Sequence, residues 1–205
     1  MEQKVRELLD ELLQNRGIRP EDIPNIELYM DQVTTFMDEH LSGYKRYPED
    51  KVLTKTMINN YTKNRLLPPS NKKKYSKEHV FLLIMIYYYK SILSISDIQN
   101  LLSSLTENYF PRNPKNGLSM NDIYSKLMEQ MEESKPDTEK EILNSLEKST
   151  GLFSSEGMNA EEEENLATFT FISQLCYDIY LRKQLIEKLL DQMCPPEKTK
   201  KKKEK

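Results

Sequence analysis

One run of side chains limits the folds open to this chain more than any other feature. Residues 80–89 read VFLLIMIYYY, apolar or aromatic throughout. A helix across this run would be apolar on every side, so other elements of the protein would have to surround it. The run is too short for a membrane span, which takes about 20 residues. We therefore expect a helix at the centre of a core, and a buried strand is the alternative that periodicity leaves open.

The composition indicates that the elements around this run are also helices. The chain has 205 residues, which is long enough for a sizeable core in one or two domains. It is 37% hydrophobic and 31% charged, with five Gly and no Trp. Leu, Glu, Lys, Met and Gln are abundant, and these residues favour helix over strand. We predict a mainly α fold.

Two amphipathic helices are expected in the first part of the chain. The first lies in residues 2–15, where Leu side chains recur at helical spacing and Gly17 stands at the position of a C-cap. The second has an apolar stripe made of Ile26, Tyr29, Met30, Val33, Phe36, Met37, His40 and Leu41. A basic loop follows at residues 42–53, which contain Gly43 and Pro48.

A short polar helix is predicted at residues 56–63. Thr54 is a suitable N-cap, and Met57, Ile58 and Tyr61 form an inward face. The opposite face then carries short polar or cationic side chains, namely Lys55, Thr56, Asn59, Asn60 and Lys63. Side chains of this kind suit insertion into a nucleic-acid groove, and an ordinary solvated helix surface is the plainer interpretation.

A basic loop follows this polar helix. Leu66 and Leu67 are expected to anchor the chain to the core before the Pro-Pro pair at 68–69 stops any helix. Residues 70–75 then form a candidate wing that carries Lys72, Lys73, Lys74 and Tyr75. Ser76 is expected to cap the central apolar helix.

Start signals of the form Ser-x-x-Asp predict further helices. One signal is Ser94 with Asp97, and the other is Ser119 with Asp122. Between them, residues 108–117 contain two Pro and a Gly. We expect this stretch to separate residues 21–107, called here the head, from a C-terminal helical region.

The longest helix is predicted at residues 160–193. Its apolar residues alternate spacings of three and four over about three heptads, at Phe169, Ile172, Cys176, Ile179, Ile186, Leu190 and Met193. This spacing is typical of a homodimer seam, and a helix packed inside a bundle is the alternative because further apolar residues widen the stripe. Before it, Thr138 with Glu141 predicts a capped helix, and residues 154–164 are expected to be flexible.

Charge divides the chain into a basic and an acidic part. Residues 45–80 hold ten basic and three acidic residues, a net charge of +7. Residues 119–194 hold seven basic and sixteen acidic residues, a net charge of −9. The asymmetry is typical of a polyanion-binding head on a body with a different task, although a solvated surface can also have such charges.

The central segment resembles a family of DNA-binding proteins. MINNYTKNRLLPPS at residues 57–70 lines up without gaps on the recognition-helix region of MerR-type regulators, TLRYYEREGLLPP, with Tyr61 on the second tyrosine. KKKYSKEHV and ILSISDIQNLL, at residues 72–80 and 92–102, resemble YRRYSEEDL and GFSLEEIKELL of the same regulators. The wider stretch 24–105 resembles the Gram-positive bacterial family called domain of unknown function 1836, which is regarded as MerR-like.

These patterns together divide the chain into four parts. An N-terminal helix lies in residues 1–20, a MerR-like winged helix-turn-helix domain in 21–107, an acidic helical region in 118–194, and a disordered Lys-rich tail in 195–205. The resemblance implies a transcriptional regulator that reads double-stranded DNA. The implied contact residues are Lys55, Thr56, Asn59, Asn60, Lys63, Arg65, Lys72, Lys73, Lys74 and Tyr75.

Two positions depart from the MerR string. Asn59 stands where those regulators have an Arg that grips phosphate, and Arg65 stands where they have Gly. The Gly position requires a left-handed backbone, and we expect Asn64 to adopt that conformation here. Lys55, Lys63 and Arg65 are expected to grip phosphate in place of the missing Arg.

Other classes of function have less support in the sequence. The chain lacks the P-loop, G-x-G-x-x-G and G-x-S-x-G motifs, so neither an enzyme nor a cofactor is expected. Cys176 and Cys194 are not spaced as a zinc pair, so no metal site is expected. Without a signal-like N-terminus or a membrane span, we expect a cytoplasmic protein with no membrane contact. A helical protein–protein adaptor with no DNA role is the remaining alternative.

Overall fold

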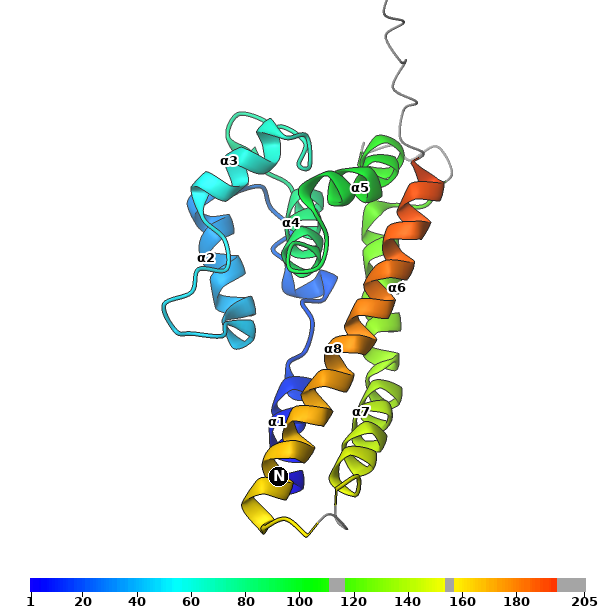
Figure 1. Cartoon of the computed structure of the whole chain (residues 1–205). Coiled ribbons are helices and arrows are strands. Elements are labelled where there is room, and N and C mark those ends of the chain that lie inside the picture. The colour runs from blue at the N-terminus through cyan, green and yellow to red at the C-terminus, as the bar shows by residue number, and fades with distance from the viewer. Residues whose placement is uncertain (111–116, 154–156, 195–205) are drawn as a thin grey trace, which may run out of the picture.

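A computed structural model describes residues 1–110, 117–153 and 157–194. The chain is mainly helical, as predicted (Figure 1). The helices in order are α1 (Glu2–Gln14), α2 (Met30–Leu41), α3 (Lys55–Lys63), α4 (Lys77–Tyr89), α5 (Ile95–Tyr109), α6 (Met120–Glu133), α7 (Lys135–Thr150) and α8 (Ala160–Met193). Short 3₁₀ helices lie at Pro20–Asp22 and Ser42–Tyr44, and two strands at β1 (Leu28–Tyr29) and β2 (Lys74–Tyr75). The tail 195–205 lies outside the described residues.

The apolar run forms α4, so the helix prediction is confirmed over the strand. Ser76 is its N-cap, and every residue from His79 to Ile86 is buried. α2, α3, α5 and α6 all supply side chains to the same core cluster. Phe81 of α4 stacks on Tyr124 of α6, with ring centroids 4.3 Å apart. Because a helix that is apolar all round has no solvent face, these neighbours are what allow α4 to exist in water.

A two-stranded antiparallel sheet joins the segment before α2 to the segment before α4. Leu28 pairs with Tyr75, and Tyr29 pairs with Lys74. Leu28 and Tyr75 are 5% and 4% exposed, so this pair faces the core, while Tyr29 is 51% exposed. The pairing fixes the base of the basic loop at residues 70–75 against the start of α2.

The C-terminal helices form an elongated bundle with α1 (Figure 1). α7 packs along α8, where Arg182 pairs with Glu141 at 2.7 Å and the Gln174 amide donates to the Ser145 hydroxyl at 3.0 Å. The amino terminus at Met1 pairs with Glu164 near the start of α8 at 2.7 Å. In Figure 1 the head lies toward one end of this bundle, and α1 runs beside the other.

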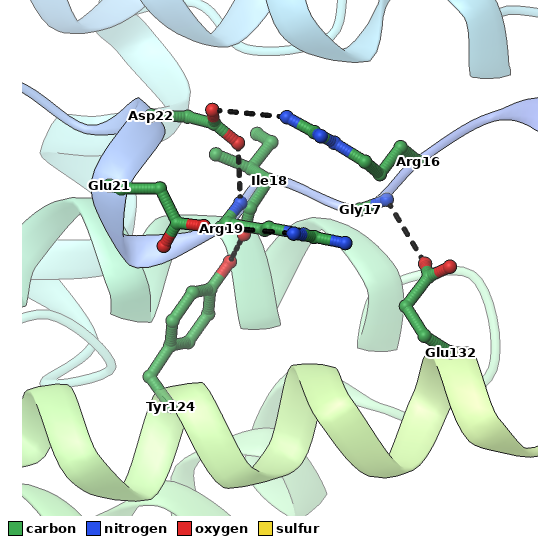
Figure 2. A network of polar contacts seen from close by, with 8 residues as sticks. All are labelled: Arg16, Gly17, Ile18, Arg19, Glu21, Asp22, Tyr124 and Glu132. Atoms are coloured by element: carbon green, nitrogen blue, oxygen red, sulfur yellow. Dashed lines mark hydrogen bonds and ion pairs between the residues drawn. The ribbon is translucent and has the colours of Figure 1, made fainter.

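The segment between α1 and α2 is fastened to α6 by polar contacts (Figure 2). The Tyr124 hydroxyl donates to the Ile18 carbonyl at 2.7 Å, and the Gly17 N–H donates to Glu132 Oε1 at 3.4 Å. Partial burial of Glu132 opposes its ionisation, but hydrogen bonds from Lys135 and Gly17 hold its pKa below the usual range. Gly17 was expected as a C-cap, and this is wrong. α1 ends at Gln14 with Asn15 extended, and Gly17 passes close to Met128 instead.

Most of the predicted helix starts after α4 are confirmed, and one is wrong. Ser94 and Ser119 are N-caps that accept from the N–H groups of Asp97 and Asp122, as expected. The box at Thr138 and Glu141 is wrong, because α7 begins earlier, after Ser134, with a proline in its first turn. The long helix starts at Ala160 as expected, so residues 160–164 of the segment predicted to be flexible are helical. Residues 154–156 lie outside the described part.

Candidate nucleic-acid interface

α3 has one buried face and one open face. Thr54 caps it by accepting from the Met57 N–H at 3.2 Å. Ile58 and Tyr61 are 0% and 7% exposed, and burial raises the pKa of the Tyr61 phenol. The opposite face is exposed along its whole length, through Lys55, Thr56, Asn59, Asn60 and Lys63. The two faces are therefore those that the sequence predicted.

α3 ends in a Schellman motif centred on Arg65. The Leu66 N–H donates to the Tyr61 carbonyl at 2.9 Å, and the Arg65 N–H donates to the Thr62 carbonyl at 3.1 Å. Arg65 is left-handed with φ of 58°, whereas Asn64 has φ of −88°. The expectation that Asn64 takes the left-handed conformation is wrong, because the 6→1 bond closes on Tyr61 and makes Arg65 the C′ residue. Its side chain is left exposed.

The basic loop at residues 70–75 is a β-hairpin with a two-residue turn. Asn71 and Lys74 exchange two backbone hydrogen bonds, of 3.1 and 2.9 Å. Lys72 and Lys73 form the turn between them, with φ of 48° and 65°. Two positive φ values in a two-residue loop are the requirement of a type I′ turn, which normally takes Asn-Gly. Both lysine side chains are exposed at the tip of this hairpin.

Tyr75 is a correction to the predicted contact set. Its side chain is 4% exposed and meets the His79 ring edge-on, with centroids 5.4 Å apart, so it belongs to the core and cannot reach a ligand. On the strand paired with it, the Tyr29 side chain is the exposed one. The Lys74 ammonium lies 5.5 Å from the centroid of the exposed Tyr29 ring. The sequence pattern had placed Tyr29 on the inward stripe of α2, and only the pairing of the strands reverses it.

His79 supports the base of the hairpin from below. It is 4% exposed, its Nδ1 accepts from the Ser76 N–H at 3.0 Å, and the Phe110 ring meets it edge-on. Burial lowers the pKa of His79, against the smaller opposing effect of the nearby Pro69 carbonyl. The imidazole is thus held neutral in the core.

Two cations in or beside the 42–53 loop have partners within the chain. Lys45 pairs with Asp38 at 2.6 Å, and the Lys90 ammonium donates to the Val52 carbonyl at 3.1 Å. Within residues 1–110, 117–153 and 157–194, no carboxylate lies within ion-pair distance of Lys55, Lys63, Arg65, Lys72 or Lys73. These five charges are available to an external anion.

Neither a membrane span nor a metal cluster occurs in the described part of the chain. None of the helices in the described ranges has the length and apolar character needed to cross a membrane. The same ranges contain no cluster of three or more His, Cys, Asp or Glu side chains arranged to hold a metal ion.

Comparison with known proteins identifies the family. No curated protein and no solved structure shows a significant match to the chain. The sequence model of the family described as "Domain of unknown function (DUF1836)" matches residues 18–127. The match covers more than half of the 205 residues and runs from the segment before α2 into α6. The chain therefore belongs to the domain of unknown function 1836 family.

Proposed function

We propose that the protein binds double-stranded DNA through α3 and the hairpin at residues 70–75, and that it acts as a transcriptional regulator. The open face of α3 carries Asn, Thr and Lys side chains, and the major groove, about 12 Å wide, accepts a helix of this kind. Further exposed cations follow that face in the chain, at Arg65 after α3 and at Lys72 and Lys73 in the hairpin. Phosphate contacts from such cations supply affinity and position the helix.

One observation carries the proposal. Among the described residues, the non-glycine residues with positive φ are Arg65, Lys72 and Lys73. All three are cationic, and all three lie in the segment between α3 and α4. A left-handed backbone costs an ordinary side chain roughly 1 kcal/mol, and Gly or Asn would avoid most of that cost. Strain retained by exposed, charged residues of one short segment points to a use for those charges.

The order of elements supports a MerR-like winged helix-turn-helix arrangement. β1, α2, α3, the hairpin and α4 follow one another, and β1 pairs with β2 at the base of the hairpin. In this arrangement α3 is the recognition helix and the hairpin is the wing. Asn59, Asn60 and Thr56 are then the base-edge readers, because an amide pairs bidentately with adenine. Lys55, Lys63, Arg65, Lys72 and Lys73 contact phosphates.

A double variant of the hairpin turn tests the contribution of its charges to DNA binding separately from their effect on stability. We expect Lys72→Asn with Lys73→Gly to stabilise the protein by about 1 kcal/mol, because Asn-Gly is the preferred pair of a type I′ turn. The same variant should bind random duplex more weakly, with a salt slope shallower by about 0.9 for each phosphate that the variant no longer neutralises. Urea unfolding and fluorescence anisotropy measure the two effects.

A matched control removes two cations elsewhere. Lys140 and Lys148 are exposed on α7, and their double replacement by Asn changes the net charge by the same amount. This control should bind DNA almost as the wild type does. Equal weakening by both double variants would show that only overall charge matters and would contradict the assigned surface. An adaptor without a DNA role predicts no salt-dependent DNA binding by any of these proteins.

A further inference from the structure

A large apolar surface of α1 and α8 is left uncovered. It comprises seven exposed residues, here called the α1–α8 surface: Leu8, Leu12, Phe169, Ile172, Cys176, Ile179 and Tyr180. Phe169, Ile179 and Leu12 are 69%, 61% and 59% exposed. Single exposed apolar residues are ordinary, but a contiguous patch of this size on a helix bundle marks an interaction site.

The two helices contribute to one continuous patch. An apolar groove of about 440 Å³ runs between them, lined by Leu8 and Leu12 from α1 and by Phe171, Ile172 and Leu175 from α8. Ile172 therefore connects the groove to the exposed face of α8. Phe169, Cys176 and Ile179 stand three, four and seven positions from it, which places them on that same face.

The area suits a second protein chain. Large side chains exposed by half or more each offer on the order of 100 Å², so the α1–α8 surface approaches the roughly 800 Å² per partner of a standard-size interface. The chain's own C-terminal residues do not match it in chemistry, because residues 195–205 read PPEKTKKKKEK and are dominated by lysine. The surface needs an apolar partner of similar extent.

The charges along α8 favour a second copy in antiparallel orientation. The helix begins with the acidic run at residues 161–164 and carries Arg182, Lys183 and Lys188 in its second half. A parallel pair would set the acidic run against itself, whereas an antiparallel pair sets it against residues 177–193 of the partner, where three basic and three acidic residues leave no net charge.

We propose that two copies of this chain associate through the α1–α8 surface, with α8 antiparallel to α8 of the partner and the two-fold axis close to Cys176. Cys176 lies midway between Phe169 and Lys183 in the sequence, so this register sets the Phe169 ring of each copy against the Lys183 ammonium of the other. Ile172 then meets Tyr180. The interface is isologous, as a two-fold dimer requires. This inference concerns helices remote from the DNA-binding surface and holds independently of that function.

Light scattering after size exclusion tests the association. The full chain has a mass of 24.3 kDa, and the dimer should be recorded at twice that mass. Ile179→Asp should shift the mass to that of the monomer, because the carboxylate would be buried against apolar side chains. Leu181→Asp is the matched control: Leu181 is an exposed aliphatic residue of α8, 48% exposed, two positions along and so on the other side of the helix. The control should remain a dimer.

Thiol cross-linking tests the register. In a Cys194→Ser background, a short bis-maleimide should join two chains through Cys176, and further replacement of Cys176 by Ser should abolish the product. Circular dichroism checks that each variant is folded. A folded wild type that stays monomeric at tens of micromolar would overturn the proposal. So would a dimer broken by Leu181→Asp but not by Ile179→Asp, or a dimer that Cys176 does not cross-link.

Discussion

At the scale of the residue, Arg65 shows both what the sequence predicts and where it fails. The MerR string that the segment resembles has Gly at this position, and that Gly correctly marks the left-handed turn after α3. Assigning the turn to Asn64 failed, because residue preference alone does not say which carbonyl closes the helix. The buried Tyr61 decides it, since its carbonyl accepts from Leu66 and so makes Arg65 the C′ residue.

Arg65→Gly should separate backbone strain from charge. We expect it to raise the free energy of unfolding by about 0.5–1 kcal/mol, because Gly adopts positive φ at little cost. If Arg65 contacts phosphate as proposed, DNA affinity should fall at the same time, because the variant lacks that cation. Urea unfolding gives the first quantity and anisotropy the second. A Gly variant that is less stable than the wild type would contradict the strain argument.

The buried His79 should make stability depend on pH. Burial lowers its pKa from the ordinary value of 6.5, so below pH 6.5 the unfolded chain binds more protons than the folded chain. Stability is therefore fully present above pH 6.5 and falls as the pH drops toward the folded pKa, by about 1.4 kcal/mol for each unit of pKa difference.

Urea unfolding between pH 7.5 and 5 measures this dependence. His79→Gln should lose part of it, even if the variant is less stable at every pH. His40→Gln, at the exposed histidine of α2, is the matched control for the loss of a histidine outside the core. Identical pH slopes for wild type and His79→Gln would refute the assignment to His79.

At the scale of the element, the helices were predictable apart from some of their ends, whereas residues 70–75 were predicted as a loop and not as a hairpin. α4 follows from its unbroken apolar run, and α3 from its cap at Thr54 and its two-faced pattern. The hairpin turn carries Lys-Lys in place of Asn-Gly, and its strands have two residues each, so neither turn chemistry nor alternation marks it. For the same reason, Tyr29 was predicted to be buried and is exposed, and Tyr75 was predicted to be exposed and is buried. Strand pairing, not helical spacing, determines which of the two side chains faces the core.

The contact between α4 and α6 should contribute a large part of the free energy of unfolding. Phe81 is 0% exposed and stacks on Tyr124, so Phe81→Ala should lower the free energy of unfolding by about 3–5 kcal/mol through reduced burial and a residual cavity. Tyr177→Ala, at an aromatic residue of α8 that is 58% exposed, should change it by about 0.5 kcal/mol or less. Similar losses of stability in both variants would mean that the α4–α6 contact is not the main source.

At the scale of the whole molecule, the head and the C-terminal helices share a core. The charge division and the break at 108–117 are visible in the sequence, but the contacts across them are not. Tyr124 stacks on Phe81 and also holds the Ile18 carbonyl, so α6 binds both the head and the segment after α1. Contacts between residues a hundred positions apart leave no local pattern, which is why the sequence suggested separate parts.

The two proposed surfaces lie on different parts of this structure. The head carries exposed cations in and after α3 that have no ion-pair partner among the described residues, and the bundle carries the α1–α8 surface. A dimer through that surface would present two copies of α3, and paired half-sites are how helix-turn-helix dimers read DNA. Because the head and the bundle share a core, the α3 surface and the α1–α8 surface belong to one folded unit.

Binding of duplex DNA by the head, through phosphate contacts and base edges, is the property on which the proposed function depends. The decisive experiment is a fluorescence anisotropy titration of a random duplex with the full-length wild-type chain at increasing salt. We expect binding at low salt, with log K falling linearly against log salt at about −0.9 per phosphate contacted. An absence of binding at the lowest salt, with the protein folded, would contradict the proposed function.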